Sequence, residues 1–300
     1  MPKEIEVKSI LNKTKNRDPW FLDDYTLNLY SSCSFNCLYC YIRGSKYGTN
    51  LEENLSVKIN GIEVLDRQLF NLKKREQYGF IVLSSATDPY LPVDKKYAMT
   101  RQALEVILKY RFPVHIITKS DLIERDYDLL QQIDREAILP SELQDSLGRG
   151  VVVSFSFSSL DDEVAQIFEK GATKPSLRCK AVQKTVAEGL HTGISLMPLL
   201  PYISDTMEQL ERFFSTFASM GVKYILPASV TLFGTEVSDS KQLVMGAIKT
   251  YFPELESKYR ELFQTGYQTP YWYKIALSKK TKKLSVQYSI ADRIENVEQV

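Results

Sequence analysis

A chain of 300 residues with 44% apolar and 25% charged side chains suits one large globular domain, or one domain with a smaller appendage. The net charge of +1 excludes a global field that would attract nucleic acid, so any basic surface must be local. The sequence has no apolar run of membrane-spanning length and no apolar signal-peptide core, which predicts a cytoplasmic protein without a membrane partner.

Short apolar runs alternate with amphipathic stretches through most of the chain. Residues 1–24 are expected to form a polar N-terminal arm. The predicted strands cover residues 25–32, 79–85, 113–120, 150–159, 192–201 and 222–230. The predicted helices cover residues 96–111, 126–133, 176–189 and 206–221. Apolar strands separated by helices predict an α/β fold, and their order favours a partial parallel (β/α)6 TIM-like barrel over residues 25–235.

The composition changes after about residue 235, so residues 236–300 are expected to be a C-terminal extension. It contains clustered aromatic residues and then four lysines: Tyr267, Tyr271, Trp272, Tyr273, Lys279, Lys280, Lys282 and Lys283. The segments "YWYKIAL" and "KLSVQYS" could pair across "SKKTK" as a β-hairpin. Such aromatic rings usually pack against a core. Beside lysines they could also stack on bases, which leaves nucleic acid open as a partner.

Three of the four cysteines lie in "SSCSFNCLYCY", directly after the first predicted barrel strand. Cys33, Cys37 and Cys40 have the spacing C-x3-C-x2-C. Thiolates suit zinc and iron–sulfur clusters, and a structural zinc ion would need a fourth ligand. Cys179 lies about 140 residues further on, on a predicted helix, and the two histidines are unpaired. Three thiolates suit a four-iron cluster that leaves one iron open to an outside ligand.

With Tyr39 before its last cysteine, this motif resembles the cluster motif of radical S-adenosylmethionine (radical SAM) enzymes. The segments "VKIN", "ATDPYLPVDKKYAMTRQALEVI", "IITKSDLIERDYDLL" and "LMPLLPYISD" narrow the resemblance to the spore photoproduct lyase-like group, often described as DNA repair photolyases. The resemblance covers residues 25–235. It implies a [4Fe–4S] cluster on the three cysteines and S-adenosylmethionine on the open iron.

In such enzymes an electron from a reducing partner, such as flavodoxin or ferredoxin, cleaves S-adenosylmethionine. The resulting 5′-deoxyadenosyl radical abstracts hydrogen from the substrate. The resemblance therefore implies a radical SAM enzyme with an unidentified substrate, and nucleic acid is the leading class by analogy. The alternative from a different class is a nucleic-acid-binding protein that a metal stabilises, without radical catalysis.

The resemblance also implies roles for single residues. Lys119 and Ser154 match positions that hold the carboxylate end of S-adenosylmethionine, and a lysine ammonium can pair with a carboxylate. Ser84 and Ser85 match the binding site of the methionine moiety. The remaining matches flank the adenosine and the cluster: Tyr39, Tyr41 and Met197. An ordinary solvated lysine is the alternative for Lys119.

The chain departs from spore photoproduct lyases at one catalytic position. Those enzymes use a barrel cysteine as hydrogen donor, and the matching position falls near Ser84. This chain has no cysteine between residues 41 and 178, so the resemblance does not carry lyase activity over. Cys179 is expected to be a buried helix residue. Arg101 and Arg125 are expected to brace helices through ion pairs.

Overall fold

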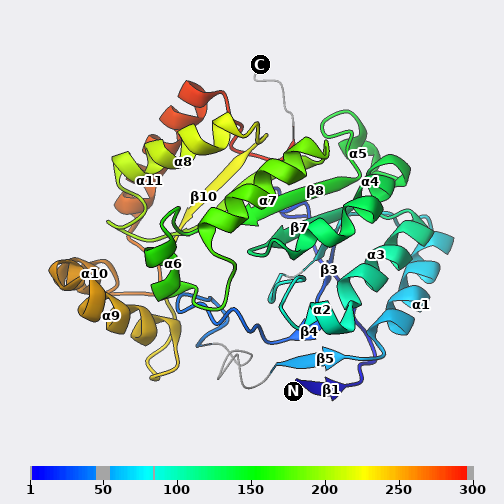
Figure 1. The fold of residues 1–300 in the computed structure, drawn as a ribbon, viewed down its shortest axis with the longest axis horizontal. Coiled ribbons are helices and arrows are strands. Elements are labelled where there is room, and N and C mark those ends of the chain that lie inside the picture. The colour runs from blue at the N-terminus through cyan, green and yellow to red at the C-terminus, as the bar shows by residue number, and fades with distance from the viewer. Residues whose placement is uncertain (1, 45–54, 84, 296–300) are drawn as a thin grey trace.

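The computed structural model describes residues 2–44, 55–83 and 85–295, and its main sheet is an open barrel (Figure 1). Its strands run in the order β10-β9-β8-β7-β6-β3-β2; β2 is antiparallel to β3, and every other pair is parallel. The strands are β2 (Leu11–Lys13), β3 (Tyr25–Leu27), β6 (Ile81–Leu83), β7 (Val114–Thr118), β8 (Val151–Ser156), β9 (His191–Leu199) and β10 (Ile225–Ser229). Six parallel strands confirm the predicted partial barrel.

Helices cover the outer side of this sheet (Figure 1). The longer ones are α1 (Gly61–Lys74), α3 (Met99–Tyr110), α4 (Tyr127–Glu136), α7 (Pro175–Ala187) and α8 (Met207–Ser219). Shorter elements of the barrel are α2 (Asp94–Tyr97), η1 (Leu122–Asp126), α5 (Ser141–Gln144) and α6 (Asp162–Phe168). The helices predicted from the periodicity of apolar residues correspond to α3, α4, α7 and α8. Each of the four buries an apolar stripe against the strands.

The N-terminal arm contributes strands to two sheets. β1 (Lys3–Ile5) pairs in parallel with β5 (Ser56–Lys58), which pairs with β4 (Tyr30–Ser31) in a small second sheet. β2 forms the edge of the barrel sheet. The arm therefore ties together segments that are far apart in the sequence.

Alternation along β8 separates an outer and an inner layer. Phe155 and Phe157 face the helices, and the Phe157 ring lies 5.0 Å from the Phe217 ring of α8. The next inward residue, Ser154, lies inside the barrel and contacts two other strands: its hydroxyl is 2.8 Å from His115 Nε2 and 2.7 Å from the Tyr224 hydroxyl. A period of two places residues 152, 154 and 156 on the inner face.

Gly193 in β9 is required by close packing inside the barrel. A Cβ atom at this position would lie 2.3 Å from the Tyr224 ring. The glycine therefore lets Tyr224 lie across β9 and reach Ser154. This polar layer, together with the apolar side chains beneath it, fills the barrel interior below its carboxyl end.

The structure corrects the predicted C-terminal hairpin, because residues 271–288 form one helix, α11. Its buried residues are Tyr273, Leu277, Thr281 and Leu284, which recur at helical spacing. "SKKTK" lacks the Asn-Gly or Gly-containing turn that a short hairpin needs, and lysine is a good helix former. Before α11 lie α9 (Ser240–Tyr251), η2 (Pro253–Leu255) and α10 (Glu256–Leu262).

After α11 the chain returns to the open edge of the barrel. The Ala291 carbonyl accepts a hydrogen bond at 2.9 Å from the amide of Ile225, the first residue of β10. Ile294 is buried in the apolar cluster at the amino end of the barrel, and its carbonyl lies 3.1 Å from His191 Nε2. The C-terminal segment is thus packed into the barrel rather than beside it.

Candidate functional site

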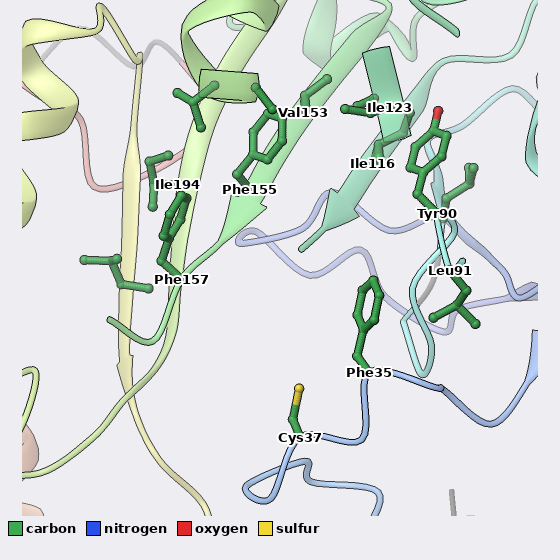
Figure 2. Packing of buried hydrophobic residues seen from close by; sticks show 14 of the residues in the cluster. Phe35, Cys37, Tyr90, Leu91, Ile116, Ile123, Val153, Phe155, Phe157 and Ile194 are labelled. Atoms are coloured by element: carbon green, nitrogen blue, oxygen red, sulfur yellow. The ribbon is translucent and has the colours of Figure 1, made fainter. Parts of the chain in front are cut away.

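A cavity of about 530 Å³ opens at the carboxyl ends of the barrel strands. The loop after β4 contributes all three clustered cysteines to its wall: Cys33, Cys37 and Cys40. Figure 2 shows Phe35 and Cys37 on this loop, facing the strands that carry Ile116 and Phe155. Function in parallel barrels is concentrated at this end, and the cavity lies where the sequence predicts it.

The cysteine loop is held in place by its own backbone and by Arg43. The Asn36 amide donates to the Cys33 carbonyl at 3.3 Å, and the Cys40 amide donates to the Cys37 carbonyl at 3.2 Å. Arg43 Nε donates to the same Cys37 carbonyl at 3.0 Å. Asn36 adopts a positive φ of 53°, which asparagine tolerates better than most residues. These contacts turn the loop twice within eight residues and aim its cysteines at one cavity.

Burial raises the pKa of all three thiols. The pKa of Cys37 rises to about 12, mainly because burial disfavours the thiolate, although Lys119 opposes the shift. The pKa of Cys33 rises well above its ordinary value through burial and the neighbouring Cys37. Three mutually repelling thiolates in one pocket need positive charge nearby, and an iron–sulfur centre supplies it. The donor set therefore fits such a centre.

Lys119 and Ser156 place a polar pair on the opposite wall. Lys119 follows β7, and its Nζ donates to Ser156 Oγ at 2.6 Å. The same Nζ lies 5.9 Å from the centre of the Tyr39 ring. The ammonium therefore sits between the cysteine loop and β8, lining the cavity with a positive charge. A carboxylate entering the cavity would meet this charge.

A buried ion pair fixes the cysteine loop against β8. Glu169 and Arg178 are almost fully buried, and their closest nitrogen and oxygen atoms are 2.5 Å apart. Glu169 also accepts hydrogen bonds from the Tyr39 hydroxyl and, at 2.6 Å, from Ser158 Oγ. Burial alone would raise the pKa of Glu169, but Arg178 and Lys119 hold the pKa below its ordinary value.

Arg178 completes this connection to the barrel. One guanidinium nitrogen donates to the Ser156 carbonyl, and the group lies 4.8 Å from the centre of the Phe157 ring. The helix α7 therefore reaches through Arg178 to both β8 and Glu169. Neither charged residue was predicted from the sequence to hold the cysteine loop.

Asp88 connects the loop after β6 to the end of β7. Its carboxylate accepts hydrogen bonds from the Lys119 amide at 2.7 Å, Thr118 Oγ1 at 2.8 Å and the Tyr90 amide at 2.9 Å. Burial raises the pKa of Asp88 to about 6 even though these donors favour the charged form. Asp88 also lines the cavity, so "TDPY" contributes to the site besides forming a turn.

The structure brings most of the predicted site residues together. Tyr39, Tyr41, Ser85, Lys119 and Met197 line the same cavity as the cysteines. The Tyr41 hydroxyl donates to the Ser85 carbonyl, which closes one wall. The prediction for Ser84 lies outside the described residues.

The structure places Ser154, one of the predicted site residues, away from the cavity. Its side chain does not line the cavity in the described structure, because its hydroxyl bonds to His115 and Tyr224 one layer further inside the barrel. Two residues further along β8, Ser156 takes the position at the cavity. The cofactor-binding role predicted for Ser154 stays a prediction, and Ser156 is the serine of this strand that lines the cavity.

Ser156 and Ser195 were missed by the sequence reasoning, as was the part played by Asp88. Both serines line the cavity from the inner faces of neighbouring strands. Polar residues at the period of two near the carboxyl ends of otherwise apolar strands were the signal that could have found them.

The remaining candidate residues have structural surroundings. Cys179 is half-buried on α7, outside the lining of the cavity, and burial raises its pKa to about 11. His115 bonds to the Phe21 carbonyl at 2.8 Å as well as to Ser154, as expected for a satisfied core histidine. Arg101 pairs with Asp128 at 2.7 Å, and Arg125 pairs with Asp94 at 2.7 Å, which confirms their bracing role.

Two further features of the described residues bear on the site. As placed, no three cysteine, histidine, aspartate or glutamate side chains of these residues surround a point where a single metal ion could sit. An iron–sulfur cluster binds each thiolate on its own iron, so its ligands need not meet at one point. No described helix has the length and apolar character needed to cross a bilayer.

Comparison with known families identifies the superfamily. The sequence model of the radical SAM superfamily matches residues 27–214, which is well over half of the chain. The chain belongs to the radical SAM superfamily. The matched segment begins in β3, includes the three cysteines and ends in α8, so it contains most of the residues that line the cavity described above.

Individual proteins are also similar to this chain. An uncharacterized protein of Mycobacterium tuberculosis strain H37Rv is 28% identical over 295 residues, which cover 96% of this chain and 81% of the relative. The radical SAM Nalpha-GlyT isomerase of Pseudomonas phage M6 is 22% identical over 231 residues, 77% of this chain and 44% of the relative.

Among solved structures, a spore photoproduct lyase with bound AdoMet and dinucleoside spore photoproduct is similar to this chain, with a TM-score of 0.63 and 16% sequence identity. The superposition covers 88% of this chain and 74% of the lyase chain. At that identity the likeness concerns the fold. The predicted radical SAM assignment is confirmed by the family model, and the fold is similar to that of spore photoproduct lyase.

Proposed function

We propose that this radical SAM protein is an enzyme that cleaves S-adenosylmethionine reductively at a [4Fe–4S] cluster and abstracts hydrogen from a substrate. The observation that carries the proposal is one cavity that combines Cys33, Cys37 and Cys40 with the Lys119 ammonium. The cysteines supply three thiolates for a cluster, and the cavity supplies room for a cofactor beside them. The bound cluster would supply the electron that splits the sulfonium, received from a reducing partner such as flavodoxin or ferredoxin.

The chain's own residues would orient the cofactor. Lys119, held by Ser156 at 2.6 Å, presents a positive charge for the carboxylate of S-adenosylmethionine. Tyr41 and Ser85 form the wall beside it, and Met197 lies on the facing strand. The Glu169–Arg178 pair holds Tyr39, and with it the cysteine loop, at a fixed distance from β8. Burial of these groups keeps water from a reactive intermediate.

Anaerobic reconstitution with iron and sulfide tests the proposal. We expect about four iron atoms per chain, and 5′-deoxyadenosine release when dithionite and S-adenosylmethionine are added. Alanine substitution of Cys33, Cys37 or Cys40 should abolish both, whereas Cys179→Ala should retain both because Cys179 lies outside the cavity. Wild-type protein that takes up no iron and cleaves no S-adenosylmethionine would sink the proposal.

A metal-stabilised nucleic-acid-binding protein is the second candidate. Helix α11 favours it, because Lys279, Lys282 and Lys283 are exposed and Tyr271 and Trp272 are exposed on its first turn. Phosphate contacts by these lysines would make binding to single-stranded DNA strongly salt-dependent. This function alone predicts one tightly bound zinc ion, DNA binding and no cofactor cleavage.

The substrate of the radical step is proposed only as a class. A nucleic acid would agree with the lysines of α11 and with the dinucleoside product bound in the similar lyase structure. In this chain the described wall of the cavity offers no cysteine besides the three of the loop, so thymine-dimer reversal with a cysteine donor is not proposed.

A further inference from the structure

A second cavity of about 410 Å³ lies between the end of β10 and helix α11. The segment Ala228–Thr231 lines both this cavity and the one that holds the cysteines. An isolated antiparallel bridge between Thr231 and Gln268 joins that segment to the chain before α11. The two cavities therefore lie on either side of one short stretch of the chain, which forms part of the wall of each.

Two buried hydroxyl groups in this second cavity lack partners. Ser229 Oγ and Thr269 Oγ1 form no hydrogen bond with any described residue, and Thr269 is only 3% exposed. Leaving a buried hydroxyl unpaired costs about 1–3 kcal/mol, so native structures rarely retain one without a use. Both residues line the cavity, which makes them available to a polar ligand.

The charges around the second cavity favour an anion. Lys274 and Lys282 line it, opposed by the carboxylate of Asp292. Asp292 also lies 3.5 Å from Arg293 Nε, which offsets its charge. Lys274 Nζ is 3.0 Å from Gln268 Oε1, whereas Lys282 has no hydrogen bond or ion pair within the described chain. Lys274 is thus held by Gln268, whereas Lys282 is free to pair with a ligand.

We propose that this second cavity is a substrate-recognition subsite that binds an anionic group, a phosphate or a carboxylate, of the molecule whose reacting carbon lies in the first cavity. The inference rests on the proposed function. Lys282 and Lys274 neutralise the anion, and the hydroxyls of Ser229 and Thr269 donate hydrogen bonds to it. Because the anion is held on a separate wall, this subsite sets the register of the substrate over the cluster.

Isothermal titration of the full reconstituted chain with inorganic phosphate and with glutarate, in low-salt buffer, tests the subsite. We expect saturable binding of at least one probe, weakened about tenfold by Lys282→Met and by Thr269→Val through loss of a charge-assisted contact and a donor. Lys283→Met is the matched control, since Lys283 is exposed on the same helix but does not line the cavity. Thr269→Ser, which keeps the hydroxyl, should restore binding.

The two probes separate the sources of the anion. Binding of phosphate alone indicates a phosphorylated substrate, binding of glutarate alone a carboxylate, and binding of both an anion subsite of broad chemistry. Saturable binding of neither, or equal losses in Lys282→Met and Lys283→Met, would overturn the inference. The same preparations report 5′-deoxyadenosine release, so a protein that cleaves S-adenosylmethionine but binds neither anion contradicts the subsite and leaves the proposed function standing.

Discussion

The Glu169–Arg178 pair shows how single residues hold the cysteine loop. Both side chains are almost completely removed from water, and each also makes contacts besides the ion pair. Desolvating two charges is expensive, and their attraction repays it only when the remaining hydrogen-bonding groups are satisfied. Here Glu169 accepts from three donors, and Arg178 donates to a carbonyl and a carboxylate, whereas Arg178 Nε is buried without a hydrogen-bond partner among the described residues. The pair therefore fixes the position of Tyr39 rather than increasing the stability of the fold.

Removing one partner should therefore destabilise the chain strongly. We expect Arg178→Met to lower the free energy of unfolding by about 3–5 kcal/mol, because it leaves Glu169 buried without its cation. The double variant with Glu169→Leu and Arg178→Met should recover part of that loss. Urea unfolding of the chain without metal measures both. Arg260→Met, which removes an exposed pair with Glu256, is the control and should cost less than about 1 kcal/mol.

The two histidines make stability depend on pH. Burial lowers the pKa of both His115 and His191 to about 4. Between about pH 6.5 and pH 4 the unfolded chain then binds more protons than the folded chain, so folding stability falls as the pH falls through this window. Asp88 acts in the opposite direction, because its raised pKa adds stability as the pH drops through about 6. A comparison of variants at equal pH removes the contribution of Asp88.

His191→Gln should flatten this dependence, because glutamine can still donate to the Ile294 carbonyl but does not titrate. A displaced pKa is worth about 1.4 kcal/mol per unit, so between pH 7 and pH 5 we expect the variant to lose about 1–2 kcal/mol less stability than the wild type. Urea unfolding at the two pH values provides the measurement. Identical losses in both proteins would show that His191 is protonated in the folded state.

At the scale of elements, α11 is the part of the chain where sequence and structure disagree most. A strand would place Leu284 and Val286 on the same face, whereas a helix places them on opposite sides. In the structure Leu284 is fully buried and Val286 is 76% exposed. The helix packs against α8, where Glu211 accepts a hydrogen bond from Gln287 at 2.9 Å.

Alanine substitutions distinguish the two forms of this segment. Leu284→Ala should cost about 2–5 kcal/mol because it opens a cavity under α11, and Val286→Ala should cost well under 1 kcal/mol. Thermal or urea unfolding of the two variants gives the comparison. Equal losses would favour the hairpin, since both residues would then share one buried face.

Much of the barrel was predictable because its strands are apolar on both faces and its helices carry regular stripes. The remaining strands depend on pairing with segments that are distant in the sequence. β1 and β2, with the sequences KEI and LNK, lack an apolar run and form because β5 and β3 offer them partners. The cysteine site followed from spacing and resemblance. Ser154 lies one layer below the cavity, because sequence gives the face of a strand more readily than the depth at which a side chain lies.

On the scale of the whole molecule, the C-terminal segment covers the open edge of the barrel sheet at β10. β10 is one edge of the barrel, and the Ile225 amide at that edge donates to Ala291 rather than to another barrel strand. Ile290 and Ile294 are buried on either side of this contact. Residues 236–295, which belong to the expected extension, thus contribute to the barrel interior as well as to the second cavity.

A chain that ends at Ser289 should therefore lose order in the barrel itself. Without residues 290–300 the Ile225 amide and His191 lose their carbonyl partners and two isoleucine side chains leave the core, at about 1.5–3 kcal/mol each. We expect hydrogen exchange, measured by mass spectrometry, to accelerate in β9 and β10 while β6 and β7 stay protected, since they pair on the far side of β8. Arg293→Ala in the full-length chain, an exposed residue of the same segment, should leave both regions unchanged. Unchanged exchange in β10 of the shortened chain would mean that the segment is an appendage and that the barrel is complete without it.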